Sequence, residues 1–124
     1  MDITPVVGAE FQLISGYGDG GFTISGVRHE GSVLILPRRT MAWAAGSVAQ
    51  LDLAGLSLLT EAEPRPAILL IGCGKAMVGL SRELRDGLRA LGIVAEPMDS
   101  GAACRTYNVL LTEGRDVAAA IIAI

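Results

Sequence analysis

The side chains best able to do chemistry gather in two short stretches of the sequence. Residues 98–111 read MDSGAACRTYNVLL and place a thiol, a guanidinium, a phenol and an amide within the five residues 104–108. Residues 72–75 read GCGK and offer a second thiol beside an amine. Such groups could hold an anion or form a reactive thiol.

Two cations could hold a small anion. Lys75 follows a predicted buried strand, and Arg105 lies early in the helix predicted after the next strand. Open α/β sheets bind ligands beyond the carboxyl ends of their parallel strands, and the free amides of a helix N-terminus favour anions. The pocket so predicted consists of Gly72, Gly74, Lys75, Ser100, Gly101 and Arg105. The alternative, which we favour, is that Arg105 forms an ion pair with Asp99 or Glu96 and fixes the joint between strand and helix.

The two cysteines, Cys73 and Cys104, permit a second hypothesis. A helix N-terminus and a nearby cation stabilise a thiolate, so the pair could be redox-active if its Cα atoms lie within about 7 Å. The favoured alternative is that both are small core residues. Two cysteines are too few for a disulfide scaffold, and a reducing compartment would keep them as thiols.

The remaining motifs predict no cofactor and no metal. Gly72-Cys73-Gly74 follows a strand, but Met77 stands where a dinucleotide-binding loop needs its third glycine, so a tight turn is favoured. His29 is the only histidine and is predicted to face solvent in a hairpin. Without a Cys/His cluster, a metal site and a catalytic triad are not expected.

The elements that would position these groups follow from hydrophobic patterning. Gly-rich turns separate four short β-rich runs in the N-terminal third, and unbroken apolar runs indicate strands covered on both faces. Strands are predicted at 12–17, 22–25, 27–29, 32–36, 67–72, 93–98 and 117–124. Helices are predicted at 53–61, 82–91 and from Ser100 to about 113, capped by Asp52, Ser81 and Ser100. We therefore predict a three-layer α/β single domain over 1–124, with a central mainly parallel sheet, flanking helices and an additional N-terminal antiparallel β layer.

The bulk properties exclude several classes of protein. The chain has 124 residues, of which 51% are hydrophobic and 19% charged, so it is not disordered. A net charge of −3 without a basic stripe argues against a nucleic-acid partner. No apolar run reaches the roughly 20 residues that span a bilayer. The N-terminus lacks the basic region of a secretory signal, so a cytoplasmic location is expected.

Several stretches resemble one small family when taken in order. They are GYGDGGFTISGVRHEGSVLILP, then Trp43, then ILLIGCGKAM, then LRALGIVAEPMDSGAACRTYNVLLTEGRDVAAAII. The sequence is similar to the Mth-type domain family of unknown function, which includes a mitochondrial complex I assembly factor. The resemblance implies a parallel sheet with helices and an extra antiparallel sheet, and no settled enzymatic activity. This chain departs from the family by having Cys73 where a small hydroxyl residue is usual.

Three further side chains receive structural predictions. Tyr107 lies on the buried stripe of its helix, and its hydroxyl is expected at the rim. Asn108 is a poor helix former, so its side chain is expected to hydrogen-bond the loop after Gly72. Trp43 either fills the core or anchors a protein partner at the surface, and the core position is favoured.

The favoured function is a non-enzymatic protein-binding or assembly factor, linked by the resemblance to respiratory complex I. Its partners would be proteins, including a membrane-associated complex, and its location cytoplasmic or peripheral to the inner membrane without insertion. We expect a monomer or weak homodimer. The alternatives are a small-anion-binding or thiol-dependent enzyme acting near Cys73, Lys75 and Arg105, and a purely structural subunit.

Overall fold

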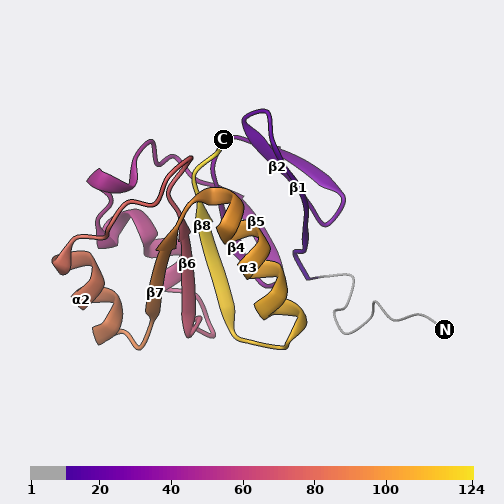
Figure 1. Cartoon of the computed structure of the whole chain (residues 1–124). Helices are drawn as coiled ribbons and strands as arrows, with labels where there is room; N and C mark the ends of the chain where they lie inside the picture. Colours follow the sequence, from indigo (N-terminus) through magenta and orange to yellow (C-terminus); the bar gives the residue numbers. More distant parts are fainter. Residues whose placement is uncertain (1–10) are drawn as a thin grey trace.

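The computed structural model describes residues 11–124 and shows an α/β domain with two sheets and three helices (Figure 1). The predicted absence of a secretory signal concerns residues 1–10, which lie outside the described residues. The strands are β1 (Ile14–Gly18), β2 (Gly21–Ile24), β3 (Val27–Glu30), β4 (Val33–Leu36), β5 (Arg39–Ala42), β6 (Ile68–Gly72), β7 (Val94–Met98) and β8 (Val117–Ile121). The helices are α1 (Ser57–Thr60), α2 (Arg82–Ala90) and α3 (Ser100–Thr112), with short 3-10 turns η1 (Val48–Gln50) and η2 (Leu53–Leu56).

The larger sheet has the strand order β5-β4-β8-β6-β7. β6 runs parallel to both β7 and β8, so that Ile68 pairs with Val94 on one side and Val117 on the other. β4 and β5 run antiparallel to their neighbours. The sheet is therefore mixed rather than mainly parallel, because it incorporates a hairpin from the N-terminal third.

That hairpin corrects the prediction in two places. β4 belongs to the larger sheet and not to the N-terminal layer, and it pairs with β8 through Val33↔Ile121. β5 was not among the strands predicted from the sequence. Pro37 and Arg38 form the two-residue connection between β4 and β5, whose ends pair as Leu36↔Arg39.

The smaller sheet, β1-β2-β3, is antiparallel and forms the predicted N-terminal β layer. The connection from β1 to β2 passes through Asp19 (φ 55°) and Gly20 (φ 77°). Positive φ at both central residues is what a tight hairpin turn of the type I′ class requires, as the Asp-Gly sequence predicts. The backbone amide of Gly20 also donates to the carbonyl of Ile124 at 2.8 Å, which brings the end of the chain to this hairpin.

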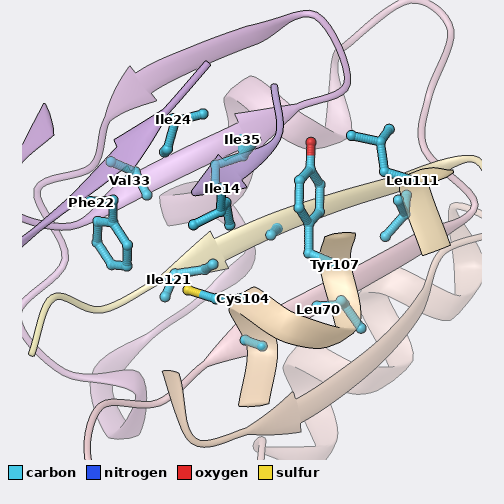
Figure 2. Close-up of a cluster of buried hydrophobic side chains, with 13 residues drawn as sticks. Ile14, Phe22, Ile24, Val33, Ile35, Leu70, Cys104, Tyr107, Leu111 and Ile121 are labelled. Carbon is cyan, nitrogen blue, oxygen red and sulfur yellow. The ribbon is translucent and has the colours of Figure 1, made fainter. Parts of the chain in front are cut away.

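Two hydrophobic cores lie on opposite faces of the larger sheet, because alternate residues of its strands point to opposite sides. The first core packs α3 and the smaller sheet against one face (Figure 2). Its largest fully buried members are Tyr107, Phe22, Ile24, Ile35 and Leu70. The second core packs α1, α2 and the segment around Trp43 against the other face, over Leu34, Leu69 and Ile71.

The helices match their predicted positions but not all of their predicted ends. Ser81 caps α2 by accepting from the Leu84 amide at 3.1 Å, and Asp52 caps η2 by accepting from Gly55 at 3.0 Å. The predicted helix 53–61 is divided between η2 and α1. α3 is capped by Asp99, which accepts from the Ala102 amide at 2.9 Å, so the assignment of this cap to Ser100 was wrong.

None of the helices in the described part of the chain is long and apolar enough to cross a membrane.

Candidate functional site

Ser100 is the centre of a junction that joins β6, β8 and α3. Its hydroxyl donates to the carbonyl of Ile122 at 2.7 Å and accepts from the amide of Gly74 at 2.9 Å. Its backbone amide donates to the Gly74 carbonyl at 2.8 Å. The side chain is completely buried. Ser100 is thus a structural cross-link at the carboxyl ends of two parallel strands, where a ligand site was predicted.

Gly72 is needed at this junction because there is no room for a side chain. A Cβ atom at Gly72 would lie 2.7 Å from Cγ2 of Ile121 and 3.1 Å from the Cα atom of Ser100. Gly74 adopts a φ of 99°, which favours glycine. The Gly-x-Gly sequence therefore serves the close approach of strand and helix and a tight turn, as favoured from the sequence.

Backbone amides that were expected to bind an anion in the predicted pocket donate to groups of the protein instead. The amide of Ser100 donates to Gly74, and the amide of Ala102 donates to the Asp99 carboxylate. Lys75 is exposed on the following loop. Occupation of the helix N-terminus by Asp99 also places a carboxylate where the anion was expected, and like charges repel each other.

Arg105 connects the two sheets instead of forming the expected ion pair. Its Nη1 donates to the hydroxyl oxygen of Tyr17 at 2.7 Å. In residues 11–124 no ion pair joins Arg105 to Asp99 or Glu96, so that expectation was wrong. Gly101 lies beneath this contact, and a Cβ atom there would be 3.0 Å from the Tyr17 hydroxyl and 3.3 Å from Nη1 of Arg105.

Asn108 makes the second connection between α3 and the smaller sheet. Its Nδ2 donates to the carbonyl of Ile14 at 2.6 Å, and its Oδ1 accepts from the amide of Ile14 at 2.9 Å. The predicted partner, the loop after Gly72, was wrong. The prediction that Asn108 makes a structural hydrogen bond is confirmed. It could be made because asparagine disfavours a helix interior, so that its presence there indicates a role for the side chain.

The two cysteines are free thiols that belong to different cores. Cys104 is buried in the core beneath the smaller sheet, with its sulfur pointing into the cluster (Figure 2), whereas Cys73 packs against the core on the other face. Burial raises the pKa of Cys104 to about 12, although the charge of Arg105 acts in the opposite direction. This geometry contradicts a Cys73–Cys104 redox pair and a stabilised thiolate at Cys104.

Tyr107 is fully buried, and its hydroxyl lies in the core and not at the rim, which corrects the prediction. Among residues 11–124 this hydroxyl has no hydrogen-bond partner. Burial raises the pKa of Tyr107 because the phenolate would be unsolvated there.

Trp43 fills the second core, with only 8% of its surface exposed. Its Nε1 donates to the carbonyl of Gly55 at 3.1 Å. The alternative of an exposed anchor for a partner was therefore wrong, and the favoured core position is confirmed.

His29 lies on the outer strand β3 as predicted, but it is half-buried and does not fully face solvent. The part of the chain that the structure describes contains no group of three His, Cys, Asp or Glu side chains able to hold a metal ion. Of the polar residues singled out from the sequence, Ser100, Arg105 and Asn108 hold α3 to the strand ends and to the smaller sheet.

A cleft of about 780 Å³ lies elsewhere, between the β4–β5 hairpin and the segment from α1 to β6. Leu36 and Met41 contribute apolar surface, Arg38 and Arg39 lie on the hairpin side, and Glu61 lies on the helix side. This cleft was not predicted from the sequence, because β5, which forms part of its lining, was not predicted either.

The family model for a protein of unknown function (DUF498/DUF598) matches residues 14–122. The chain belongs to this family. An uncharacterised family relative from Rhodobacter capsulatus is 42% identical over 88% of this chain and 82% of its own length. A solution structure from Bordetella pertussis, described as an Mth938-like domain, superposes with a TM-score of 0.81 at 26% identity, over 98% of this chain and 92% of that one. The resemblance stated from the sequence is therefore confirmed.

A further relative carries a functional name. It is the NADH dehydrogenase [ubiquinone] 1 alpha subcomplex assembly factor 3 of Xenopus tropicalis, 35% identical over 114 residues. The match covers 92% of this chain but 62% of the assembly factor. The chain thus spans less than two thirds of that relative's length.

Proposed function

We propose that this protein is a non-enzymatic assembly factor that binds protein subunits of a membrane-bound NADH dehydrogenase. The similarity that carries the proposal is the 35% identity to the Xenopus assembly factor over 92% of this chain. The whole domain, and not one motif, is shared. The partner would be a subunit or intermediate of the complex, and the protein would act as a monomer or weak homodimer.

The geometry supports binding rather than catalysis. Arg105, Asn108 and Ser100 are all engaged in hydrogen bonds that join one element of the fold to another. Cys104 is a buried thiol whose raised pKa disfavours a nucleophilic thiolate. A fold whose polar residues are used in this way presents a rigid surface, which suits recognition of another protein.

We further propose that the protein works in the cytoplasm, peripheral to the inner membrane. The complex that it would serve is anchored there, and the described helices provide no span of their own. Contact with the membrane would be reversible.

Genetic replacement in Rhodobacter capsulatus tests the proposal, because the relative there is 42% identical to this chain. The gene for the relative is deleted, this chain is expressed, and assembled NADH dehydrogenase is measured on native gels and by activity in washed membranes. We expect the deletion to lower the amount of complex and this chain to restore it. A normal complex in the deletion strain, or a defect that the folded chain does not restore, would contradict the proposal.

The matched control for the replacement is a variant that cannot keep its fold. Gly72→Val places side-chain atoms where even a Cβ would lie 2.7 Å from Ile121. Restoration by the parent chain and not by this variant shows that the folded domain is responsible.

A further inference from the structure

The connection between β6 and α2 carries apolar side chains that are exposed to solvent. Five consecutive residues, 75–79, are all exposed, and within them Met77 is 61% and Val78 37% accessible. The connection is held at its ends, where the Cys73 amide donates to Met98 and the Ser81 hydroxyl caps α2. Between these ends, the sulfur of Cys73 contacts the carbonyl of Val78 at 3.5 Å.

The helix that follows adds positive charge on its outer face. Leu84 and Leu88 are buried, and Arg82, Arg85 and Arg89 are exposed away from them, with the carboxylate of Asp86 exposed beside these arginines. Spacings of three and four residues place these arginines in one stripe. We call the exposed set the loop–helix patch. It consists of Lys75, Met77, Val78, Arg82, Arg85 and Arg89.

The net charge of the segment that contains the patch is opposite in sign to the net charge of the whole chain. Residues 75–89 contain four cationic and two acidic side chains, a net charge of +2, whereas the full chain has −3. The rest of the chain therefore carries −5. An anionic surface would be attracted to the loop–helix patch and repelled by the net charge of the rest of the chain, which favours one orientation of approach.

The cations of the patch are also unengaged within residues 11–124. Elsewhere Arg28 pairs with Glu30 at 2.7 Å, Arg65 donates to two carbonyls, and Arg105 donates to Tyr17. The four cations of the patch have no hydrogen bond or ion pair to any described residue. Their charges are free for a partner.

Neither of two hollows in the described structure is lined by Met77 or Val78. One lies on the β4–β5 hairpin and α1 side, and the other lies around Trp43. An exposed Met-Val pair flanked by cations suits a fluid interface, into which the two side chains can insert.

We propose that the loop–helix patch docks on the anionic surface of a lipid bilayer. Met77 and Val78 enter the headgroup region, while Lys75 and the α2 arginines lie against lipid phosphates. The inference deepens the proposed function, on which it rests for the presence of a membrane at the site of action.

Vesicle co-sedimentation of the full chain tests this inference without any respiratory complex. One set of vesicles contains phosphatidylcholine alone, and the other contains equal parts of phosphatidylcholine and phosphatidylglycerol. We expect binding to the second set only, and its loss at about 1 M salt, where charges are screened beyond about 3 Å. Arg85→Gln/Arg89→Gln and Met77→Ser/Val78→Ser are each expected to lower the partition coefficient by about tenfold.

Matched controls are available on other surfaces. Arg39→Gln/Arg115→Gln removes two exposed charges, and Val27→Ser/Val109→Ser removes two valines that are 56% and 54% exposed. Both controls should bind as the parent does, and thermal unfolding verifies that all four variants are folded.

Three outcomes overturn the inference. They are no binding to the anionic vesicles, equal losses in patch and control variants, and patch variants that bind vesicles normally but lose capture of detergent-solubilised NADH dehydrogenase. The last outcome would make the patch a protein interface. Since the vesicle assay contains no complex, failed vesicle binding beside a successful genetic replacement rejects the membrane contact alone.

Discussion

The carboxamide of Asn108 pairs with the backbone of Ile14 as a neighbouring β-strand would, donating to its carbonyl at 2.6 Å and accepting from its amide at 2.9 Å. A single helical side chain thereby satisfies both polar groups of a residue in β1. Seven residues earlier in α3, Gly101 lies beneath Tyr17 of the same strand. β1 therefore runs antiparallel to α3, and the smaller sheet is held to the rest of the fold by polar contacts as well as by its core.

We predict that Asn108→Ala destabilises the protein by about 2 kcal/mol, because it leaves the Ile14 amide and carbonyl without partners in a partly buried position. Urea unfolding followed by circular dichroism measures the change. Val109→Ala is the control on the same helix, since Val109 is 54% exposed, and it should change stability by less than about 0.5 kcal/mol. Equal effects of the two substitutions would show that the Asn108 contact contributes nothing specific.

Ser100→Ala should cost more stability than Asp99→Ala. The first substitution leaves the carbonyl of Ile122 and the amide of Gly74 unsatisfied inside the protein, at a cost of about 2–4 kcal/mol. The second removes an N-cap from a partly exposed helix end, which costs about 1 kcal/mol. The ranking is measured by urea unfolding of both variants. The reverse order would mean that the Asp99 cap contributes more to stability than the hydrogen bonds of the Ser100 hydroxyl.

Gly72→Ala is expected to destabilise the protein by about 2–4 kcal/mol, because the added methyl group meets Ile121 and the backbone of Ser100. Gly79→Ala is the matched control. At Gly79 the position of a Cβ atom is open, and φ is not positive, so no strain arises. Thermal unfolding of both variants gives the comparison. A tolerated Gly72→Ala would show that the junction can relax.

Stability should fall as the pH rises above about 9. The folded pKa of Cys104 is raised to about 12 from an ordinary value of 9.0, so the unfolded chain loses this proton first. Between these two values stability falls by at most about 1.4 kcal/mol per pH unit from this thiol, and below pH 9 the contribution is fully present. Urea unfolding at several pH values measures the slope.

Cys104→Ala supplies the control for this pH dependence. The variant should lose the slope between pH 9 and 10, whereas the burial of Tyr107, whose pKa is also raised, adds a fall above pH 10 in both proteins. An unchanged slope between pH 9 and 10 in the variant would mean that Cys104 titrates normally in the folded state.

The α/β class and most elements could be predicted because they rest on local patterns. The buried stripe of α2 and the unbroken apolar run of β6 need no knowledge of their neighbours. The sequence of β4 also contains a pattern that indicates its place in the larger sheet. Three of its four residues are fully buried, and VLIL does not alternate, which is typical of a strand covered on both faces rather than of a half-exposed layer.

The contacts of the candidate site could not be predicted in the same way. Asn108 and Ile14 are 94 residues apart, and Arg105 and Tyr17 are 88 apart, so which groups meet depends on the tertiary arrangement. Residue type indicated that Arg105 and Ser100 would have polar partners. The predicted partners were groups close to them in sequence. In the fold, both residues bond to groups from distant segments.

The central place of β8 in the larger sheet has a consequence for synthesis on the ribosome. β8 is translated after the other four strands of this sheet, yet it alone joins β4 to β6. Until residues 117–121 emerge, the β4–β5 hairpin and the β6–β7 pair have no shared neighbour and expose apolar edges. The larger sheet is therefore completed only when residues 117–121 pair with β4 and β6, and this pairing covers the edges that would otherwise aggregate.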